Sequence, residues 1–204
     1  MPAIPRLLLI RHGETAWNAE KRWQGWADVP LSPVGEEQAK QAAVALSTFF
    51  SVDAPLHLIA SSDLTRAQQT AEILRVHLAA HDPIHTEWGL RERDVGELSG
   101  LTAAQVEEHW PGLLARWRAG GIEAPPGGES TADFLARTRE AVESLLAGTP
   151  PGSTTLAVTH GGVIRVLEHH LGVESLGTRN LGGRFFHVEE TTLAAGEILM
   201  LESV

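Results

Sequence analysis

Three polar loops carry the residues whose types could do chemistry, and each follows a short apolar stretch of the chain. The loops are Arg11-His12-Gly13-Glu14-Thr15, Ser61-Ser62-Asp63-Leu64-Thr65-Arg66 and Thr159-His160-Gly161-Gly162. The stretches before them, at 7–10, 56–60 and 155–158, are typical of buried strands. Ligands bind beyond the carboxyl ends of parallel strands. We therefore expect Arg11, His12, Arg66 and His160 to converge at one edge of a sheet.

Side chains of these types suit the transfer of a phosphoryl group. An arginine presents a planar fork of donors that matches phosphate oxygens. One neutral histidine can attack phosphorus through a ring nitrogen, and a second, protonated or donating, can stabilise charge on the transferring group. Gly13, Gly161 and Gly162 let backbone amides approach an anion. The loops therefore predict a phosphate site with a histidine nucleophile.

The leaving oxygen of such a reaction needs an acid that gives it a proton. Glu92 is the candidate, because it lies on a loop after a predicted short strand at 84–86. Glu87, Asp94 and Glu97 are close enough in the sequence to be alternatives.

Two interpretations without chemistry also remain for the loop residues. Arg66 could pair with Asp63 one turn earlier, and His160 could only begin the following helix. The other histidines match no motif, and we expect them to be surface or core residues. Gly13 is not part of a nucleotide-binding P-loop, since no Gly-Lys-Ser/Thr follows it.

Strands that alternate with helices predict an α/β sheet covered on both faces. The expected helices lie at 33–50, 63–78, 102–117 with a break at Pro111, 130–146 and 163–171. Ser32-Pro33 is a helix-start signal, and Ser130 and Asp133 are spaced like a capping box. A hairpin at 185–189 and 198–201 is expected to close the fold.

Composition narrows the class of protein. A chain of 204 residues without cysteine predicts a single domain with no disulfide, thiolate metal site or cysteine nucleophile. The net charge of −10 disfavours nucleic-acid binding. No apolar stretch approaches the roughly 20 residues of a membrane span, and the first residues lack the pattern of a signal peptide. We expect a cytoplasmic protein that contacts neither membranes nor nucleic acid.

The loops also carry a resemblance to a known family. Five segments resemble the motifs of the histidine phosphatase superfamily, also called phosphoglycerate mutase-like, in family order from residue 8 to about 165. They are Leu8-Leu9-Ile10-Arg11-His12-Gly13-Glu14-Thr15, Trp23-Gln24-Gly25-Trp26, Ser61-Ser62-Asp63-Leu64-Thr65-Arg66, Leu90-Arg91-Glu92-Arg93-Asp94 and Val158-Thr159-His160-Gly161-Gly162. The resemblance implies a three-layer α/β/α fold around a mostly parallel sheet, and no metal or other cofactor.

The resemblance also implies roles for individual residues. His12 would become phosphohistidine, and Glu92 would donate a proton and later activate water. Arg11, Arg66 and His160 would line the phosphate pocket. The further substrate-binding residues would be Asn18, Gln24, Gly25 and Gly161.

The helical insert at about 101–129 is expected to act as a lid over the substrate. Six tryptophans and no tyrosine are present. We expect Trp17, Trp23 and Trp26 near the site to wall the pocket, and Trp88, Trp110 and Trp117 to belong either to the lid or to the core.

Phosphatases and mutases of this superfamily share the same central residues. The mutases carry an Arg-rich insertion that grips a bisphosphate, whereas the insert here has only Arg116 and Arg118 against Glu107, Glu108 and Glu123. This composition resembles the small broad-specificity and α-ribazole phosphatases, and it favours hydrolysis of a small phosphorylated metabolite. Mutase-type transfer is the alternative, and a non-catalytic phosphate-binding module is a weaker one. A monomer and a homodimer are both compatible with the sequence.

Overall fold

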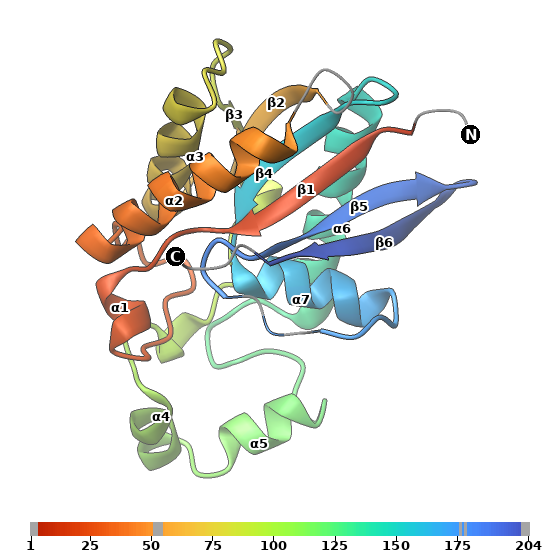
Figure 1. Cartoon of the computed structure of the whole chain (residues 1–204). Coiled ribbons are helices and arrows are strands. Elements are labelled where there is room, and N and C mark those ends of the chain that lie inside the picture. Colours follow the sequence, from red (N-terminus) through yellow and green to blue (C-terminus); the bar gives the residue numbers. More distant parts are fainter. Residues whose placement is uncertain (1–3, 51–54, 176, 178, 201–204) are drawn as a thin grey trace.

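A computed structural model describes residues 4–50, 55–175, 177 and 179–200. Its centre is a six-stranded sheet of order β3-β2-β4-β1-β5-β6 (Figure 1). β1, β4, β2 and β3 pair in parallel, while β5 and β6 are antiparallel at one edge. The strands are β1 (Arg6–Arg11), β2 (Leu56–Ser61), β3 (His85–Thr86), β4 (Thr154–Thr159), β5 (Gly183–Glu189) and β6 (Thr192–Leu199). The mostly parallel sheet that the sequence predicts is thus confirmed.

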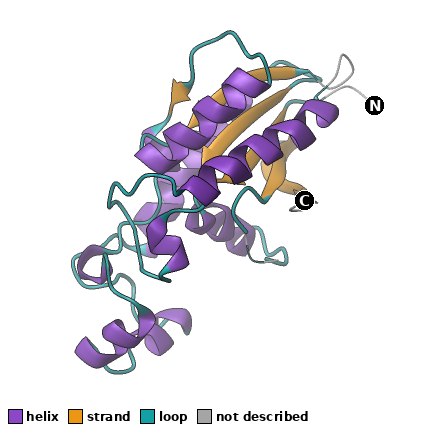
Figure 2. Ribbon diagram, turned by 60° about the vertical axis from the view of Figure 1, so that its left-hand side comes forward, coloured by secondary structure: helices purple, strands orange, loops and turns teal. Residues whose placement is uncertain are grey.

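Helices cover both faces of this sheet, which gives three layers (Figure 2). The α-helices are α1 (Ala16–Ala19), α2 (Pro33–Phe49), α3 (Thr65–His77), α4 (Ala103–His109), α5 (Leu113–Arg118), α6 (Thr131–Gly148) and α7 (Gly161–His170), and the 3-10 turns are η1 (Trp88–Leu90) and η2 (Gly96–Leu98). Leu7 and Leu9 of β1 pack under α6 and α7, whereas Leu8 and Ile10 pack under α2 and α3. Successive side chains of a strand face opposite ways, so both faces of β1 are buried.

The register of the central strands brings the polar loops together. Arg11 at the end of β1 lies opposite Thr159 at the end of β4, and Ser61 at the end of β2 lies opposite Val158. The three loops therefore leave the sheet at the same edge, as the sequence predicts.

Several element boundaries differ from those expected. α3 begins at Thr65 rather than at residue 63, because Asp63 has a partner on another loop. α7 begins at Gly161 rather than at residue 163. β6 begins at Thr192, earlier than the predicted 198, and Leu201 lies outside the described residues. Ser130 caps the Asp133 amide, but the reciprocal bond of a capping box is absent from this helix start.

The insert between η2 and α6 forms two short helices with a small apolar cluster of their own. α4 and α5 lie apart from the sheet, at the bottom of Figure 1. Pro111 ends the first helix, and Gly112 takes a left-handed conformation before the second. Val106, Leu113 and Leu114 are buried against Trp110 and Trp117. Within the described part of the chain, no helix is long and apolar enough to cross a membrane.

Candidate active site

A cavity of about 910 Å³ opens beyond the carboxyl ends of the central strands. Its lining includes eight of the nine site residues predicted from the sequence, namely Arg11, His12, Asn18, Gln24, Gly25, Arg66, Glu92 and Gly161. His160 is the exception: it is fully buried, and its ring packs edge-on against His12 with the two ring centres 5.1 Å apart. Residues from four separate segments of the chain thus meet in one cavity.

His12 is held in a single tautomer by its neighbours. Its Nδ1 lies 2.6 Å from the carbonyl oxygen of Gly13, which can only accept, so Nδ1 carries the ring hydrogen. Its Nε2 accepts from Nε of Arg66 at 3.2 Å, so that nitrogen has a lone pair. The ring therefore presents an unprotonated Nε2 at the cavity wall, as a nucleophile requires.

Burial and charge keep both histidines neutral. His12 is 3% exposed, and desolvation, then the charges of Arg66 and Arg11, hold its pKa well below 6.5. Desolvation, then the Arg66 charge, likewise lowers the pKa of His160 far below 6.5. The protonated form considered for the second histidine is therefore disfavoured, which leaves the donating neutral form.

The backbone of the His12 loop is fixed by residues from other segments of the chain, and of these Thr159 lies in a sequence motif whereas Asn180 does not. The His12 amide donates to Thr159 O at 2.9 Å, and Asn180 Nδ2 donates to the His12 carbonyl at 2.8 Å. Thr70 Oγ1 accepts from the Gly13 amide at 3.1 Å. A Cβ on Gly13 would lie 2.5 Å from the Gly35 carbonyl, so only glycine allows this packing.

Arg66 is anchored by carbonyls rather than by an acid. Its two terminal nitrogens each donate at 2.8 Å, to Ala27 O and Gly25 O. Asp63 pairs instead with Arg91 through two bonds of 2.7 Å, so the proposed pairing of Arg66 with Asp63 is wrong. Burial lowers the pKa of Arg66 to about 10, and the group remains charged at neutral pH.

His160 has one ring nitrogen without a partner among the described residues. Its Nε2 lies 2.9 Å from Ser62 Oγ, and that oxygen accepts from the Leu64 amide. The Ser62 hydroxyl is therefore suited to donate to Nε2, which leaves the ring hydrogen on the unpartnered Nδ1. A buried donor without a partner is costly, and an anion in the site would satisfy it. His160 is the N-cap residue of α7, as the alternative predicts, but its side chain makes no capping hydrogen bond, so capping does not explain the choice of histidine.

Asn18 and Gln24 turn their amide oxygens toward a common hydroxyl. Thr15 Oγ1 lies 3.2 Å from Asn18 Oδ1 and 3.1 Å from Gln24 Oε1. Asn18 also closes a capping box on α1. Both residues line the cavity, and the amide nitrogen of each is a donor that suits an anion.

Glu92 enters the cavity from the loop after η1. Its Oε2 accepts from the Gly162 amide at 3.0 Å, and its Oε1 accepts from the Arg93 amide at 2.8 Å. A Cβ on Gly162 would collide with this carboxylate, so a larger residue there would displace Glu92 from its present position. The sequence predicts that the Gly162 amide approaches an anion of the substrate, but in the structure this amide donates to the carboxyl group of Glu92.

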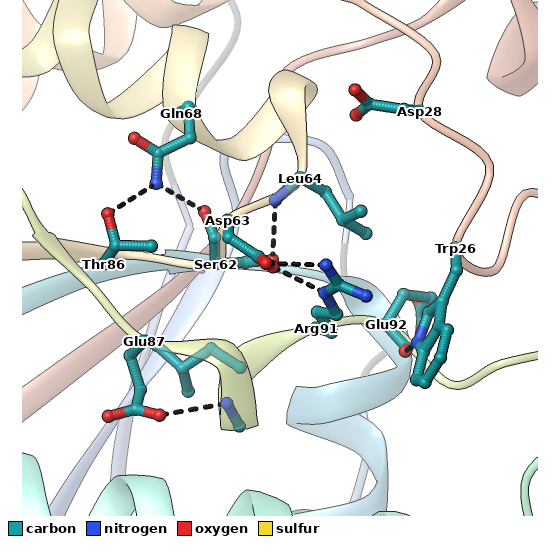
Figure 3. A network of polar contacts seen from close by, with 12 residues as sticks. Trp26, Asp28, Ser62, Asp63, Leu64, Gln68, Thr86, Glu87, Arg91 and Glu92 are labelled. Atoms are coloured by element: carbon teal, nitrogen blue, oxygen red, sulfur yellow. Dashed lines mark hydrogen bonds and ion pairs between the residues drawn. The ribbon is translucent and has the colours of Figure 1, made fainter.

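The three alternatives to Glu92 do not line the cavity. Figure 3 shows Glu87 turned away toward its own loop, where it accepts from the Gly89 amide at 3.0 Å. Asp94 accepts from the Gly96 amide at 2.9 Å, and Glu97 is exposed. Of the four carboxylates, the geometry therefore favours Glu92 as the proton donor.

The loop that carries Glu92 is held from two sides. Arg91 binds Asp63, as Figure 3 shows. Next to Arg91 in the chain, the Glu92 carbonyl accepts a hydrogen bond of 2.8 Å from Trp26 Nε1. Arg137 on α6 is 8% exposed and donates to the carbonyls of Gly89, Arg91 and Glu92 at 2.8–2.9 Å. These bonds fix the backbone of the loop and so the position from which the Glu92 carboxylate enters the cavity.

Arg137 is thus expected to position Glu92 without touching substrate. Arg137→Lys keeps a charge beside Glu129 but cannot reach three carbonyls. We expect a loss of about 2 kcal/mol in stability, or a fall of about 6 °C in Tm, by calorimetry. Turnover should fall about tenfold for an alkyl phosphate and less for p-nitrophenyl phosphate, whose leaving group needs no proton. Arg139→Lys, on the exposed side of α6, should change neither, and equal slowing with both substrates would argue against positioning.

The tryptophans divide between the cavity and the packing around it. Trp23 and Trp117 line the cavity with their rings 5.7 Å apart, whereas Trp17 and Trp26, which are also expected to wall it, do not. Trp26 packs edge-on against Trp88, which is half-exposed. Trp110 packs within the cluster of the insert. One wall of the cavity is thus aromatic and comes partly from α5.

The fold and the site together define a three-layer α/β protein with a neutral, oriented histidine in a cationic cavity. The sequence matches the histidine phosphatase superfamily (branch 1) over residues 7–193, and the chain belongs to this family.

Relatives in this family include both phosphatases and mutases. The chain is 40% identical over 169 residues to a glucosyl-3-phosphoglycerate phosphatase of Mycobacterium tuberculosis strain H37Rv, covering 79% of this chain and 73% of the relative. It is 35% identical over 173 residues to a 2,3-bisphosphoglycerate-dependent phosphoglycerate mutase of Cytophaga hutchinsonii, covering 82% and 78%. A solved structure of the mycobacterial phosphatase with VO3 has a TM-score of 0.81 at 33% identity, and the match covers 94% of this chain and 96% of that one. The chain is therefore an enzyme of this family.

Proposed function

We propose that this enzyme hydrolyses small phosphomonoesters without a metal, through a phosphohistidine on His12. One observation carries the proposal: His12 Nε2 is unprotonated, because Nδ1 donates to Gly13 O, and it faces a cavity lined by Arg11 and Arg66. A neutral imidazole beside fixed positive charge is suited to attack a phosphoryl group.

The proposed reaction has two steps. In the first, Nε of Arg66 releases its hydrogen bond to Nε2 of His12, whose lone pair then bonds to phosphorus. The ester P–O bond breaks, and Glu92 gives a proton to the departing alkoxide. In the second, Glu92 takes a proton from water, whose oxygen attacks phosphorus and releases inorganic phosphate from the histidine. Arg11, Arg66 and the free Nδ1 hydrogen of His160 stabilise charge on the phosphoryl oxygens. Glu92 ends the cycle protonated, as it began.

Hydrolysis is favoured over mutase-type transfer by the insert. Arg118 is the one basic residue of α4 and α5 that lines the cavity. The two helices therefore supply only one of the cationic side chains that a mutase needs to bind a bisphosphate. Mutase activity remains the second candidate, because curated relatives at 35–36% identity are phosphoglycerate mutases. A non-catalytic module is disfavoured, since His12, Arg66, Glu92 and His160 are all present.

The remaining parts of the proposal concern the setting of the enzyme. We infer a cytoplasmic enzyme, monomeric or homodimeric, that binds a small phosphorylated metabolite and neither nucleic acid nor a membrane surface. The insert at about 101–129 would serve as the lid of a single domain. The position of Trp117 and Arg118 in the cavity wall supports this role.

Two assays separate the candidates. The enzyme should release p-nitrophenolate from p-nitrophenyl phosphate in excess chelator, at the rate seen without chelator. With 3-phosphoglycerate it should release phosphate, and 2,3-bisphosphoglycerate should not divert the product to 2-phosphoglycerate. Fast isomerisation with little phosphate release would establish the mutase instead. Loss of all activity in chelator would rule out the metal-free mechanism.

A further inference from the structure

Trp26 belongs to one of the sequence motifs, yet it does not line the cavity. It lies within residues 25–28, which we call the bridging segment. Figure 3 shows Trp26 beside Glu92, and Asp28 on the same stretch of chain near the start of α3. Arg66, which α3 carries, and Glu92 act on the same phosphoryl group in the proposed reaction. The contacts of the bridging segment therefore bear on how these two side chains are placed relative to each other.

On one side, the bridging segment holds the start of α3. The two terminal nitrogens of Arg66 donate to the carbonyls of Gly25 and Ala27, each at 2.8 Å. The Asp28 carboxylate accepts from the amide of Thr65 at 2.8 Å and from its hydroxyl at 2.7 Å. The N-cap residue of α3 makes no side-chain hydrogen bond of its own, so Asp28 caps this helix from outside it. The segment thus fixes both the guanidinium of Arg66 and the helix that carries it.

On the other side, the bridging segment packs against the loop of Glu92. The indole Nε1 of Trp26 donates to the Glu92 carbonyl at 2.8 Å. A Cβ on Gly25 would lie 2.9 Å from the amide nitrogen of Val95 and 3.2 Å from the carbonyl oxygen of Arg93. The two backbones are therefore in direct contact, and the Trp26 hydrogen bond fixes one against the other.

The Trp26 ring also contacts a second link between the same two parts of the chain. Arg91, next to Glu92, binds Asp63 just before α3 through two bonds of 2.7 Å (Figure 3). The guanidinium carbon of Arg91 lies 5.1 Å from the centre of the Trp26 ring. A cation over an aromatic face is attracted to it, so the ring favours the position from which Arg91 reaches Asp63. One side chain thus supports both links.

We propose that Trp26 is a positioning residue that sets the placement of Glu92 relative to Arg66. The leaving oxygen of a phosphomonoester and the oxygens that Arg66 would bind share one phosphorus atom, so the proton donor must be placed relative to the arginine. Misplacement by about 1 Å can cost as much as 10²-fold in rate. The inference rests on the proposed function and adds to it a residue that does not touch substrate.

The test removes the indole donor and measures a single chemical step. Trp26→Phe keeps an aromatic ring but has no N–H. In rapid-quench experiments at saturating substrate, phosphorylation of His12 by an alkyl phosphate such as glycerol 3-phosphate should slow about tenfold. With p-nitrophenyl phosphate, whose leaving group needs no proton, it should slow less than about twofold. Phosphorylation of His12 is common to hydrolysis and mutase-type transfer, so the test does not depend on which of the two follows.

Trp88→Phe is the matched control. Trp88 packs edge-on against Trp26 and is half-exposed, and its indole donates no hydrogen bond to any residue that the structure describes. This variant loses the same N–H group outside the cavity and should phosphorylate His12 at the wild-type rate with both substrates. Replacing Trp26 by benzothienylalanine, which has the shape of tryptophan with sulfur in place of N–H, provides a second variant should Trp26→Phe not fold. It should show the same difference between the substrates.

A double-mutant cycle shows whether Trp26 acts through Glu92. Residues that act through one another have non-additive effects, so in a Glu92→Gln background the change Trp26→Phe should alter the rate with the alkyl phosphate by less than about twofold. A tryptophan that only stabilises the fold or shapes the cavity would slow both substrates alike, and its effect would persist when Glu92 is replaced.

The outcomes separate this role from the proposed function. Equal slowing of the two substrates, or slowing that persists in the Glu92→Gln background, would overturn the positioning role. If the wild-type enzyme forms phosphohistidine in that case, the proposed function stands without it. If the wild-type enzyme forms no phosphoenzyme from any phosphomonoester, the proposed function fails, and the positioning role fails with it.

Discussion

Early quenching of the wild-type reaction should yield an acid-labile, alkali-stable phosphoenzyme that His12→Ala does not form. The lone pair of His12 Nε2 is the proposed nucleophile, and alanine has none. We expect turnover to fall by on the order of 10⁴-fold or more, as for the loss of other nucleophiles. The measurement is rapid-quench trapping with radiolabelled substrate, together with steady-state kinetics.

The control for this variant must show that the protein still folds. His12 lies on a loop after β1, so His12→Ala should keep the circular dichroism spectrum of the wild type. His77→Ala, on the exposed face of α3 and outside the cavity, should form the phosphoenzyme normally. Wild-type-like turnover in His12→Ala would falsify the mechanism.

The pH dependence follows from the same environment. Because burial and Arg66 hold the pKa of His12 below 6.5, phosphorylation of His12 should persist at pH values where an ordinary histidine is protonated. The same lowered pKa values make the folded state less stable in acid. The unfolded chain takes up protons on both histidines below about pH 6.5, and the folded chain does not. The free energy of unfolding should therefore fall as pH drops below 6.5. The fall should be smaller in His12→Ala, measured by denaturant titration.

The convergence of Arg11, His12 and Arg66 could be predicted because each follows a short apolar stretch. The parallel pairing of such strands places their ends at one edge, and the pairs Arg11–Thr159 and Ser61–Val158 show this register. Local pattern and topology were sufficient for this part of the site.

Other parts of the site depend on contacts that no local pattern encodes. Asn180 and Arg137 act on backbone carbonyls far away in the sequence, so neither stands in a recognisable motif. The choice of Glu92 over Asp94 also required the structure, because the loop between β3 and α4 has no periodicity that fixes its register. The complete burial of His160 against the His12 ring depends on the packing of side chains around it, which the order of the strands does not predict.

Glu92→Gln should affect alkyl phosphates and p-nitrophenyl phosphate differently. The need for a proton donor rises with the basicity of the leaving group. p-Nitrophenolate leaves readily without a proton, whereas a sugar or glycerate alkoxide does not. Phosphorylation of His12 should therefore slow by roughly 10²–10⁴-fold for an alkyl phosphate, and far less for p-nitrophenyl phosphate. The amide keeps nearly the shape of the carboxylate, so its fit against Gly162 is changed little.

Dephosphorylation should slow for both substrates, since the same carboxylate is proposed to activate water in the second step. With p-nitrophenyl phosphate, the Glu92→Gln variant should give a burst of p-nitrophenolate and accumulate phosphohistidine, which rapid-quench kinetics would detect. Glu97→Gln, an exposed carboxylate outside the cavity, is the matched control and should behave as the wild type. A simple loss of negative charge would slow phosphorylation alike for both substrates and give no burst. That outcome would remove the proton-donor role from Glu92 and assign it to a neighbour such as Asp94.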